Sequence, residues 1–426
     1  MKRIYTPAKK KTVLLVDADQ IVLHVYLEKF QSLGFKVEVA HDAKQARKTV
    51  HQGSIDLVML DLALPEGDGL ELLKSIRSEP GASSLPVVVF CNSYRGNLVR
   101  EAEAAGATKC VSRAECDASE ILALIRQLLG DAVPNLAPSG DDTSAPQQAK
   151  APAEKELVAA FQLKVSQALA SLRTDYLVVA RSGPDQSHPA ELLGMHEQVH
   201  GLVGSAGVLG FRRIAQSASA LEALLMELHA TPKRATHSVI RTLGQALDLL
   251  AGLNDETASP DCGDVNLSRV LVVDDEVISR QVICLALGKA NLLPVSADDA
   301  RSAEQLLKQE HFDLILLDVE MPGRSGLELC LEIRQMPSHR TTPVIFVTAH
   351  SDFGTQAQSV LNGGNDFIVK PFLPVELAVK ALGWLFRKVP QQTATNAPLG
   401  GAPASGESVE SPESVAPLTL VPLRHE

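Results

Sequence analysis

The chain repeats part of its own sequence, and this repeat limits the folds available to it. "VLLVDAD" in the first half matches "VLVVDDE" in the second half, which places Asp17 opposite Asp274 at an offset of 257 residues. The same offset places Asp61 opposite Asp318. The matching stretches are 12–19 with 269–276, 55–69 with 312–326, and 85–93 with 342–350. Registration sustained over so many positions indicates an internal duplication, so we expect two copies of one domain.

Each copy alternates short β-branched runs with amphipathic helical stretches, such as "ISRQVICLALGKA" at 278–290. The β-branched runs lack polar alternation, so we expect helices to cover both faces of their sheet. This pattern predicts a doubly wound, flavodoxin-like (βα)5 domain with a parallel sheet. In the second copy the strands are expected near 269–274, 293–297, 313–318, 343–348 and 366–370.

Reactive side chains stand where four of these strands end. Asp274 and Asp275 end the first strand, Asp318 the third, Thr348 the fourth and Lys370 the fifth. Ligands of such folds collect at the carboxyl ends of the strands. Three carboxylates brought together there would repel one another unless a cation lies among them, and oxygen ligands suit Mg²⁺. A hydroxyl and an ammonium opposite them suit a phosphoryl group, so we expect metal-assisted phosphoryl transfer onto Asp318.

Residues 268–389 resemble the receiver domain of two-component response regulators. The resemblance rests on "VLVVDDE", "LILLDVEMPGRSG", "PVIFVTAH" and "DFIVKPF", which together cover the domain. It implies Asp318 as the phosphorylated residue and Thr348, Lys370 and the aromatic Phe367 as switch or phosphate-binding residues. It also implies a Mg²⁺ site formed by Asp274, Asp275, Asp318 and the backbone carbonyl of Glu320.

Residues 1–130 resemble the same family, with substitutions at the expected site. Asp61 and Asp17 remain, but Ala18 stands for Asp275, Cys91 stands for Thr348, and Ser112, followed by Arg113, is aligned with Lys370. The neighbouring Asp19 should point to the other side of the strand, so it should not replace the missing ligand. Loss of a carboxylate and of the ammonium predicts a degenerate receiver, kept for docking or dimerisation, with Asp61 at most a weak phosphorylation site.

Residues 155–253 form no β-rich runs and predict a four-helix bundle. Within them, "HGLVGSAGVLG" starts at His200 and carries several glycines. A phosphate-binding loop is disfavoured because the run lacks GxxxxGK[ST] and follows no strand. A stripe of small residues for close helix packing stays open as an alternative. The run also resembles the signature of histidine phosphotransfer (HPt) domains.

That resemblance implies that His200 is a surface nucleophile that carries a phosphoryl group. Gly204, one helical turn later, would then give clearance to a docking receiver, and Gly207 and Gly210 would end the helix or let a neighbour approach. Val203 departs from the family, which usually has a lysine there. Such an exposed ion pair contributes about 0–1 kcal/mol, so we expect its loss to tune transfer rather than abolish it.

Flexible segments are expected at 131–154, at 254–267 and in a tail at 390–426, because these stretches are rich in Pro, Ser, Gly or acid and lack periodicity. The net charge of −11, without a long basic stripe, argues against direct DNA binding. No run approaches the roughly 20 apolar residues of a membrane span. The six cysteines form no CxxC pair, which fits reduced thiols and a cytoplasmic location.

These features together predict a phosphorelay protein arranged receiver–HPt–receiver. Expected partners are histidine kinases and other receiver or HPt proteins, and dimerisation is possible; we find no ATP-binding kinase module, so the chain should not itself be a kinase. Output should pass through protein contacts. The alternative is a largely non-catalytic adaptor whose modules serve docking. The sequence leaves open whether the linker holds His200 near Asp318 or apart from it.

Overall fold

The structure is a computed structural model of the whole chain. It describes residues 10–64, 69–94, 96–114, 118–130, 147–182, 186, 188–256, 267–349 and 363–387. The tail predicted at 390–426 lies outside the described residues, as do most of the two segments predicted to be flexible.

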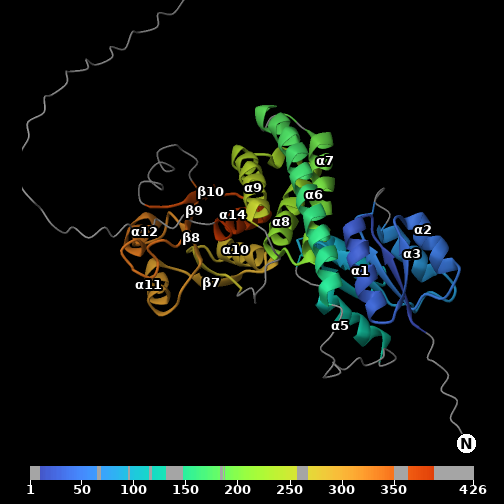
Figure 1. Cartoon of the computed structure of the whole chain (residues 1–426). Coiled ribbons are helices and arrows are strands. Elements are labelled where there is room, and N and C mark those ends of the chain that lie inside the picture. The colour runs from blue at the N-terminus through green and yellow to red at the C-terminus, as the bar shows by residue number, and fades with distance from the viewer. Residues whose placement is uncertain are drawn as a thin grey trace, which may run out of the picture. The chain divides into compact units, whose positions relative to one another are not determined.

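The first α/β domain is built on a five-stranded parallel sheet with strand order β2-β1-β3-β4-β5. It is the blue part of the chain near the N-terminus, where helices pack against the sheet (Figure 1). Its strands are β1 (Thr12–Val16), β2 (Lys36–Ala40), β3 (Leu57–Asp61), β4 (Val87–Cys91) and β5 (Lys109–Ser112). Its helices are α1 (Gln20–Ser32), α2 (Ala43–His51), α3 (Gly69–Ser78), α4 (Gly96–Ala104) and α5 (Ala118–Leu129).

Successive side chains of a strand are buried in two separate hydrophobic cores, one on each face of the sheet. Val13 and Leu15 of β1 are buried in the core that α1 and α5 cover, and Leu14 and Val16 are buried in the core under α2, α3 and α4. Burial on both faces explains why the strands are continuous apolar runs. It also leaves the carboxyl ends of the strands as the place where polar side chains can gather.

The second α/β domain repeats this architecture, with strand order β10-β9-β8-β6-β7. Its strands are β6 (Arg269–Val273), β7 (Leu293–Ala297), β8 (Leu314–Asp318), β9 (Val344–Thr348) and β10 (Asp366–Val369). Its described helices are α10 (Val277–Lys289), α11 (Ala300–Gln309), α12 (Gly326–Ile333) and α14 (Pro374–Leu385). The flavodoxin-like fold class and the strand positions predicted from the sequence are confirmed.

The duplication extends to details that the sequence match did not use. Asp42 and Asp299, again 257 residues apart, each cap the N-terminus of the second helix of their domain. Nε of Arg77 donates to the carbonyl of Gly106, and Nε of Arg334 donates to that of Gly363, both at 2.8 Å. The two domains therefore share helix caps and loop clamps as well as a sheet.

The middle segment forms a bundle of four helices, as predicted. These are α6 (Gln147–Ser182), α7 (Pro189–Leu209), α8 (Arg212–Ala230) and α9 (His237–Glu256), with the short 3-10 helix η2 (Pro232–Arg234) before α9. The prediction of a flexible segment up to residue 154 is wrong from Gln147 onward, because α6 begins there.

The bundle shares its core with one face of the second α/β domain. Leu377 and Leu382 of α14 belong to the same buried cluster as Leu224 of α8 and Leu243 of α9. A polar contact reinforces this packing, since the Ser238 hydroxyl donates to the Glu376 carboxylate at 2.6 Å. Of the described helices, none is both long and apolar enough to cross a membrane.

The glycine run at the end of α7 has a defined backbone role. Gly210 ends the helix in the left-handed region, with φ 83°, and its N–H bonds to the carbonyls of Ala206 and Gly207. Glycine is favoured there because it has no Cβ to clash. This confirms the part of the prediction that placed the end of the helix within the glycine run.

Candidate functional site

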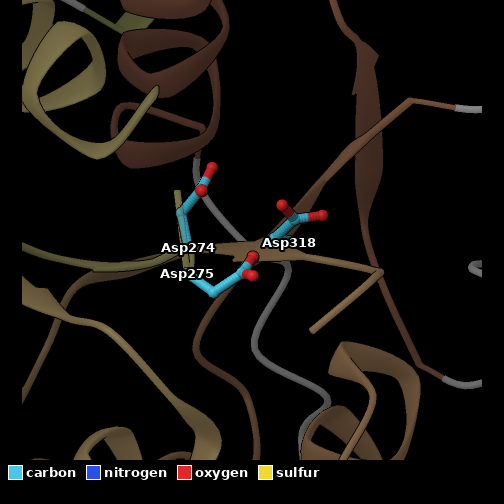
Figure 2. Close-up of side chains that lie close together, drawn as sticks. All are labelled: Asp274, Asp275 and Asp318. Carbon is cyan, nitrogen blue, oxygen red and sulfur yellow. The ribbon is translucent and has the colours of Figure 1, made fainter. Parts of the chain in front are cut away.

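Three carboxylates meet at the strand ends of the second α/β domain (Figure 2). Asp274 and Asp275 follow β6 and Asp318 ends the neighbouring β8, so the parallel pairing of these strands brings their ends together. One oxygen of each carboxylate lies within 4.8 Å of the others. Asp274 and Asp318 are buried and Asp275 is exposed. The cluster is a group of hard oxygen donors open to solvent on one side, as a Mg²⁺ site requires.

The Lys370 ammonium spans two of these acids. Its Nζ donates to Oδ2 of Asp318 at 2.6 Å and to Oδ2 of Asp274 at 2.8 Å. Burial disfavours the charged ammonium, but the two carboxylates outweigh it and raise the pKa of Lys370. Burial also raises the pKa of Asp318, against the opposing effect of Lys370. The lysine therefore supplies a fixed positive charge at the acidic cluster.

Backbone and side-chain contacts hold the acids in place. The Ser279 hydroxyl donates to Oδ2 of Asp274 at 2.6 Å, and the Glu320 amide donates to Oδ1 of Asp318 at 3.1 Å. Glycine is required at Gly326, because a Cβ there would lie 1.9 Å from the backbone oxygen of Asp318. The first turn of α12 thus packs directly on the backbone of Asp318.

Two of the three predicted switch or phosphate-binding residues lie on adjacent strands. Thr348 is buried at the end of β9, and Phe367 stands on the neighbouring β10. The guanidinium of Arg241, from α9 of the bundle, lies 4.4 Å from the centre of the Phe367 ring. Phe367 is therefore in contact with the bundle.

At the corresponding strand ends of the first α/β domain, an arginine lies against the acids. Nη2 of Arg113 lies 2.5 Å from Oδ2 of Asp17 and 3.0 Å from Oδ2 of Asp61. All three side chains are buried. The guanidinium also lies over the Phe90 ring, 5.0 Å from its centre. A permanent cation thus bridges the two acids that this copy retains.

His200 of α7 joins this ion-pair group. Its Nε2 lies 3.1 Å from Oδ2 of Asp61, and its Nδ1 lies 2.9 Å from Oε1 of Glu222 on α8. Ionised carboxylates only accept hydrogen bonds, so both ring nitrogens must donate, which requires the charged imidazolium. Burial disfavours that charge, but Asp61 and Glu222 outweigh it and raise the pKa of His200 to about 10. Burial likewise opposes the charge of Asp61, yet Arg113 and His200 lower its pKa to about 2.

Two further polar contacts surround this group. Nδ2 of Asn92, just after β4, donates to Oε2 of Glu222 at 2.6 Å. On the other side, the Lys164 ammonium of α6 donates to Oδ2 of Asp19 and to the carbonyl of Gly201, both at 2.8 Å. The first α/β domain is therefore bonded to the bundle on both sides of His200.

Two glycines of α7 let Arg113 approach. A Cβ at Gly204 would lie 2.6 Å from Nη1 of Arg113, and a Cβ at Gly207 would lie 2.3 Å from its backbone oxygen. Real Cβ atoms essentially never approach a neighbour closer than 3.0 Å, so a side chain at either position would force a shift, and at Gly207 the atom that must move belongs to the backbone. The clearance predicted for a docking receiver exists, and the first α/β domain of this chain fills it.

Comparison with known families identifies these domains. The model of the response regulator receiver domain matches residues 13–126 and 270–381, and that of the Hpt domain matches residues 156–253. The chain belongs to the response regulator receiver family. Two receiver domains flank an HPt domain, as the resemblance implied.

Similar proteins include transcriptional regulators and chemotaxis proteins. The phosphate regulon transcriptional regulatory protein PhoB of Escherichia coli is 36% identical over 112 residues, which is 26% of this chain and 49% of PhoB. The transcriptional regulatory protein ResD of Bacillus subtilis is 35% identical over 132 residues, 31% of this chain and 53% of ResD. This chain therefore spans about half the length of these curated relatives.

Among solved structures, the chemotaxis protein CheY4 of Vibrio cholerae is 30% identical, with a TM-score of 0.26, over 27% of this chain and 96% of CheY4. The receiver domain of NtrX from Brucella abortus is 32% identical, with a TM-score of 0.26, over 27% of this chain and 97% of that domain.

One residue assignment in the first receiver domain is corrected by the strand pairing. Ser112 pairs with Cys91 in this domain as Val369 pairs with Thr348 in the other, so Ser112 corresponds to Val369. Arg113, not Ser112, takes the place of Lys370. The expected loss of the cation is therefore wrong, because an arginine supplies it. The 257-residue offset, carried on to the last strand, would have identified Arg113.

The expected exposure of His200 is also corrected. Its side chain is only 19% exposed, because the first receiver domain covers it. Val203, where the family has a lysine, is buried at the same interface. An apolar residue suits a covered position better than an unpaired ammonium would. Asp19 caps α1 and pairs with Lys164 of the bundle.

Sequence reasoning missed three functional candidates, namely Glu222, Asn92 and Lys164. Glu222 had a detectable signal, since it is an acid within the apolar run "SASALEALL" of α8 and is fully surrounded by protein. Buried acids are rare unless paired. Asn92 and Lys164 show no unusual pattern in the sequence. Their role follows only from the contact between the first receiver domain and the bundle.

Proposed function

We propose that Asp318 is the phosphoryl acceptor of this phosphorelay protein and that His200 is a phosphoryl carrier. One observation carries the assignment of Asp318: its carboxylate lies among two further acids and a lysine at the strand ends of a receiver domain. Asp61 lacks such a set, since its partners are Arg113 and His200. The two receiver copies would then have different roles.

The donor set of the second receiver domain fits Mg²⁺. The carboxylates of Asp274, Asp275 and Asp318 would hold the ion, together with the backbone carbonyl of Glu320. When bound, Mg²⁺ would offset the negative charge of the acids and of an incoming phosphoryl group. The exposure of Asp275 leaves the cluster accessible from solvent, which supports this assignment.

The transfer itself would use groups of this chain. An oxygen of Asp318 forms a bond to phosphorus while the P–N bond of a phosphohistidine donor breaks, and the released imidazole takes a proton from solvent. Lys370, now paired with Asp318, would shift to the new phosphoryl oxygens. The Thr348 hydroxyl would hydrogen-bond to the same oxygens. Histidine kinases and other HPt proteins are the donors that this chemistry implies.

The adaptor alternative finds support in one domain only. The first receiver domain has Ala18 where the second has Asp275, and His200 already pairs with Asp61, which favours docking over phosphorylation there. The second receiver domain has its full set of acids and its lysine. We therefore assign the docking role to the first domain and the phosphoryl chemistry to the second.

Paired substitutions in the two copies test the acceptor. The purified full chain, incubated with acetyl phosphate and Mg²⁺, should acquire one phosphoryl group. Asp318→Asn should lower the labelled fraction at least about 100-fold, because the nucleophile is lost. Asp61→Asn, the matched change 257 residues earlier, should leave that label intact. Intact-mass spectrometry would measure both, with chelation of Mg²⁺ as a further control.

Retained labelling of Asp318→Asn together with loss of label in Asp61→Asn would reverse the assignment. Labelling that does not change when EDTA removes Mg²⁺ would contradict the proposed metal site.

A further inference from the structure

The contact between His200 and Asp61 leaves no room for a phosphoryl group. An attacking atom approaches phosphorus from roughly 3–3.5 Å, with the phosphorus between donor and acceptor. Here Nε2 of His200 and Oδ2 of Asp61 are themselves 3.1 Å apart. The nitrogen that would attack carries a proton, because it donates to the carboxylate. His200 is therefore held in a form that can neither accept nor pass on a phosphoryl group.

Arg113 makes this contact independent of a metal ion. When an active receiver domain docks on an HPt domain, the acids of the receiver site repel one another unless a divalent cation lies among them. In the first receiver domain the guanidinium already lies against Asp17 and Asp61 and is buried. It is always charged and binds carboxylates through a rigid planar group. The acids next to His200 are thus neutralised by the protein itself.

The surface of α7 is shaped to this particular partner. Gly204 and Gly207 face the side chain and the backbone of Arg113, and the buried Val203 lies on the same surface. Asn92 and Lys164 add bonds on either side of His200. Three independent features, namely clearance, apolar cover and polar bonds, therefore match the first receiver domain to the bundle.

We propose that the first receiver domain is an intrachain cap on His200, in which Arg113, at the position of Lys370, supplies the positive charge beside Asp17 and Asp61. The cap occupies the surface that an active receiver domain would need in order to exchange a phosphoryl group with His200. Its removal would admit a metal-loaded receiver, such as the second receiver domain of another copy of this chain. This inference rests on the proposed role of His200 as a carrier.

The test measures how fast His200 reacts in the full chain. All variants carry Asp318→Asn, so that the result does not depend on the aspartyl acceptor. Phosphoramidate is the donor: its P–N bond breaks, ammonia leaves, and deprotonated Nε2 forms the new N–P bond. Acid-labile, base-stable label at His200 is then located by mass spectrometry. We expect slow labelling with the cap present and labelling at least tenfold faster when it is released.

Two variants release the cap by different means. Arg113→Ala removes the cation, with Arg100→Ala as its control, because Arg100 is an exposed arginine that donates to Gly96 and Asn97 of its own helix. Gly207→Ala places a methyl group against the backbone of Arg113 while favouring the helix, so the bundle should stay folded. Its control is Gly252→Ala, where a methyl group would meet nothing.

NMR titration of His200 separates the cap from the carrier role. Release of the cap should lower the pKa of His200 from about 10, because the Asp61 carboxylate is then no longer beside the imidazole. A released His200 that stays unlabelled would contradict its carrier role, and label that survives His200→Gln would do the same. The cap would be overturned if His200 were labelled as fast in the chain with Asp318→Asn alone as in both release variants. It would also be overturned if both variants left rate and pKa unchanged.

Discussion

Replacing Gly326 with alanine is expected to destabilise the second receiver domain by roughly 1–3 kcal/mol, because the new methyl group cannot fit. A Cβ at this position would lie 1.9 Å from the backbone oxygen of Asp318. That oxygen belongs to a buried central strand and cannot move alone. Helix α12 would have to shift away from the strand end, which would also disturb the acidic cluster. We therefore expect a loss of phosphorylation together with a loss of stability.

Gly288→Ala is the matched control, since a Cβ there would meet nothing within 4 Å. It should stabilise α10 by about 0.5–1 kcal/mol, as alanine normally does in a helix. The single tryptophan, Trp384 of α14, reports on this domain in urea unfolding. Equal midpoints for Gly326→Ala and the wild type would show that the strand and α12 are not packed as described.

Replacing Glu222 with glutamine is expected to cost about 2–4 kcal/mol, because it removes the buried partner of a charged imidazole. Glu222 accepts from His200 and Asn92, and its carboxylate lies 3.5 Å from Nε2 of His196. Burial opposes its charge, but the two histidines hold the pKa of Glu222 well below its usual range. An amide of the same shape cannot stabilise the imidazolium.

The pKa of His200 should therefore fall by roughly one unit or more in Glu222→Gln, where each unit corresponds to about 1.4 kcal/mol. Glu227→Gln on the same helix is the control, because Glu227 is 40% exposed and pairs with Arg234. It should change the free energy of unfolding by less than about 0.5 kcal/mol. An unchanged His200 pKa in Glu222→Gln would contradict the ion-pair group.

The same groups predict how the cap depends on pH. The pKa of His200 is raised from 6.5 to about 10, so its stabilisation is fully present below pH 6.5 and is lost as the pH rises through 10. The pKa of Asp61 is lowered from 3.8 to about 2, so its contribution is present above pH 3.8 and is lost as the pH falls through 2. Both contributions are present in full between about pH 3.8 and pH 6.5, so the contact between the first receiver domain and the bundle should be strongest in that range.

The sequence alone predicts most of the fold and the second receiver site. The duplication predicts two matching sheets, and the strand ends predict that Asp274, Asp318 and Lys370 converge. This works because strand order and strand ends follow from local patterns that occur twice. The four helices of the bundle were likewise recognisable from their periodicity.

The contact between the first receiver domain and the bundle could not be predicted in the same way. Asp61, Arg113, His200 and Glu222 lie far apart in sequence, and no local pattern states which domain surfaces meet. The glycines of α7 indicated that something must approach, but not that Arg113 does. Arg113 itself was misassigned because the alignment slipped by one residue at the last strand.

A single NMR titration tests the division between the two receiver copies most directly. The amides of Glu320 and Ala63 are matched reporters, since each donates to Oδ1 of the central aspartate of its domain, Asp318 and Asp61 respectively. Beryllofluoride with Mg²⁺ mimics a phosphoryl group and is added to the isotope-labelled full chain. We predict that the Glu320 amide signal shifts and that the Ala63 signal does not. A shift at Ala63 comparable to that at Glu320 would contradict the account, because Arg113 would then not exclude a phosphoryl group and its metal from Asp61.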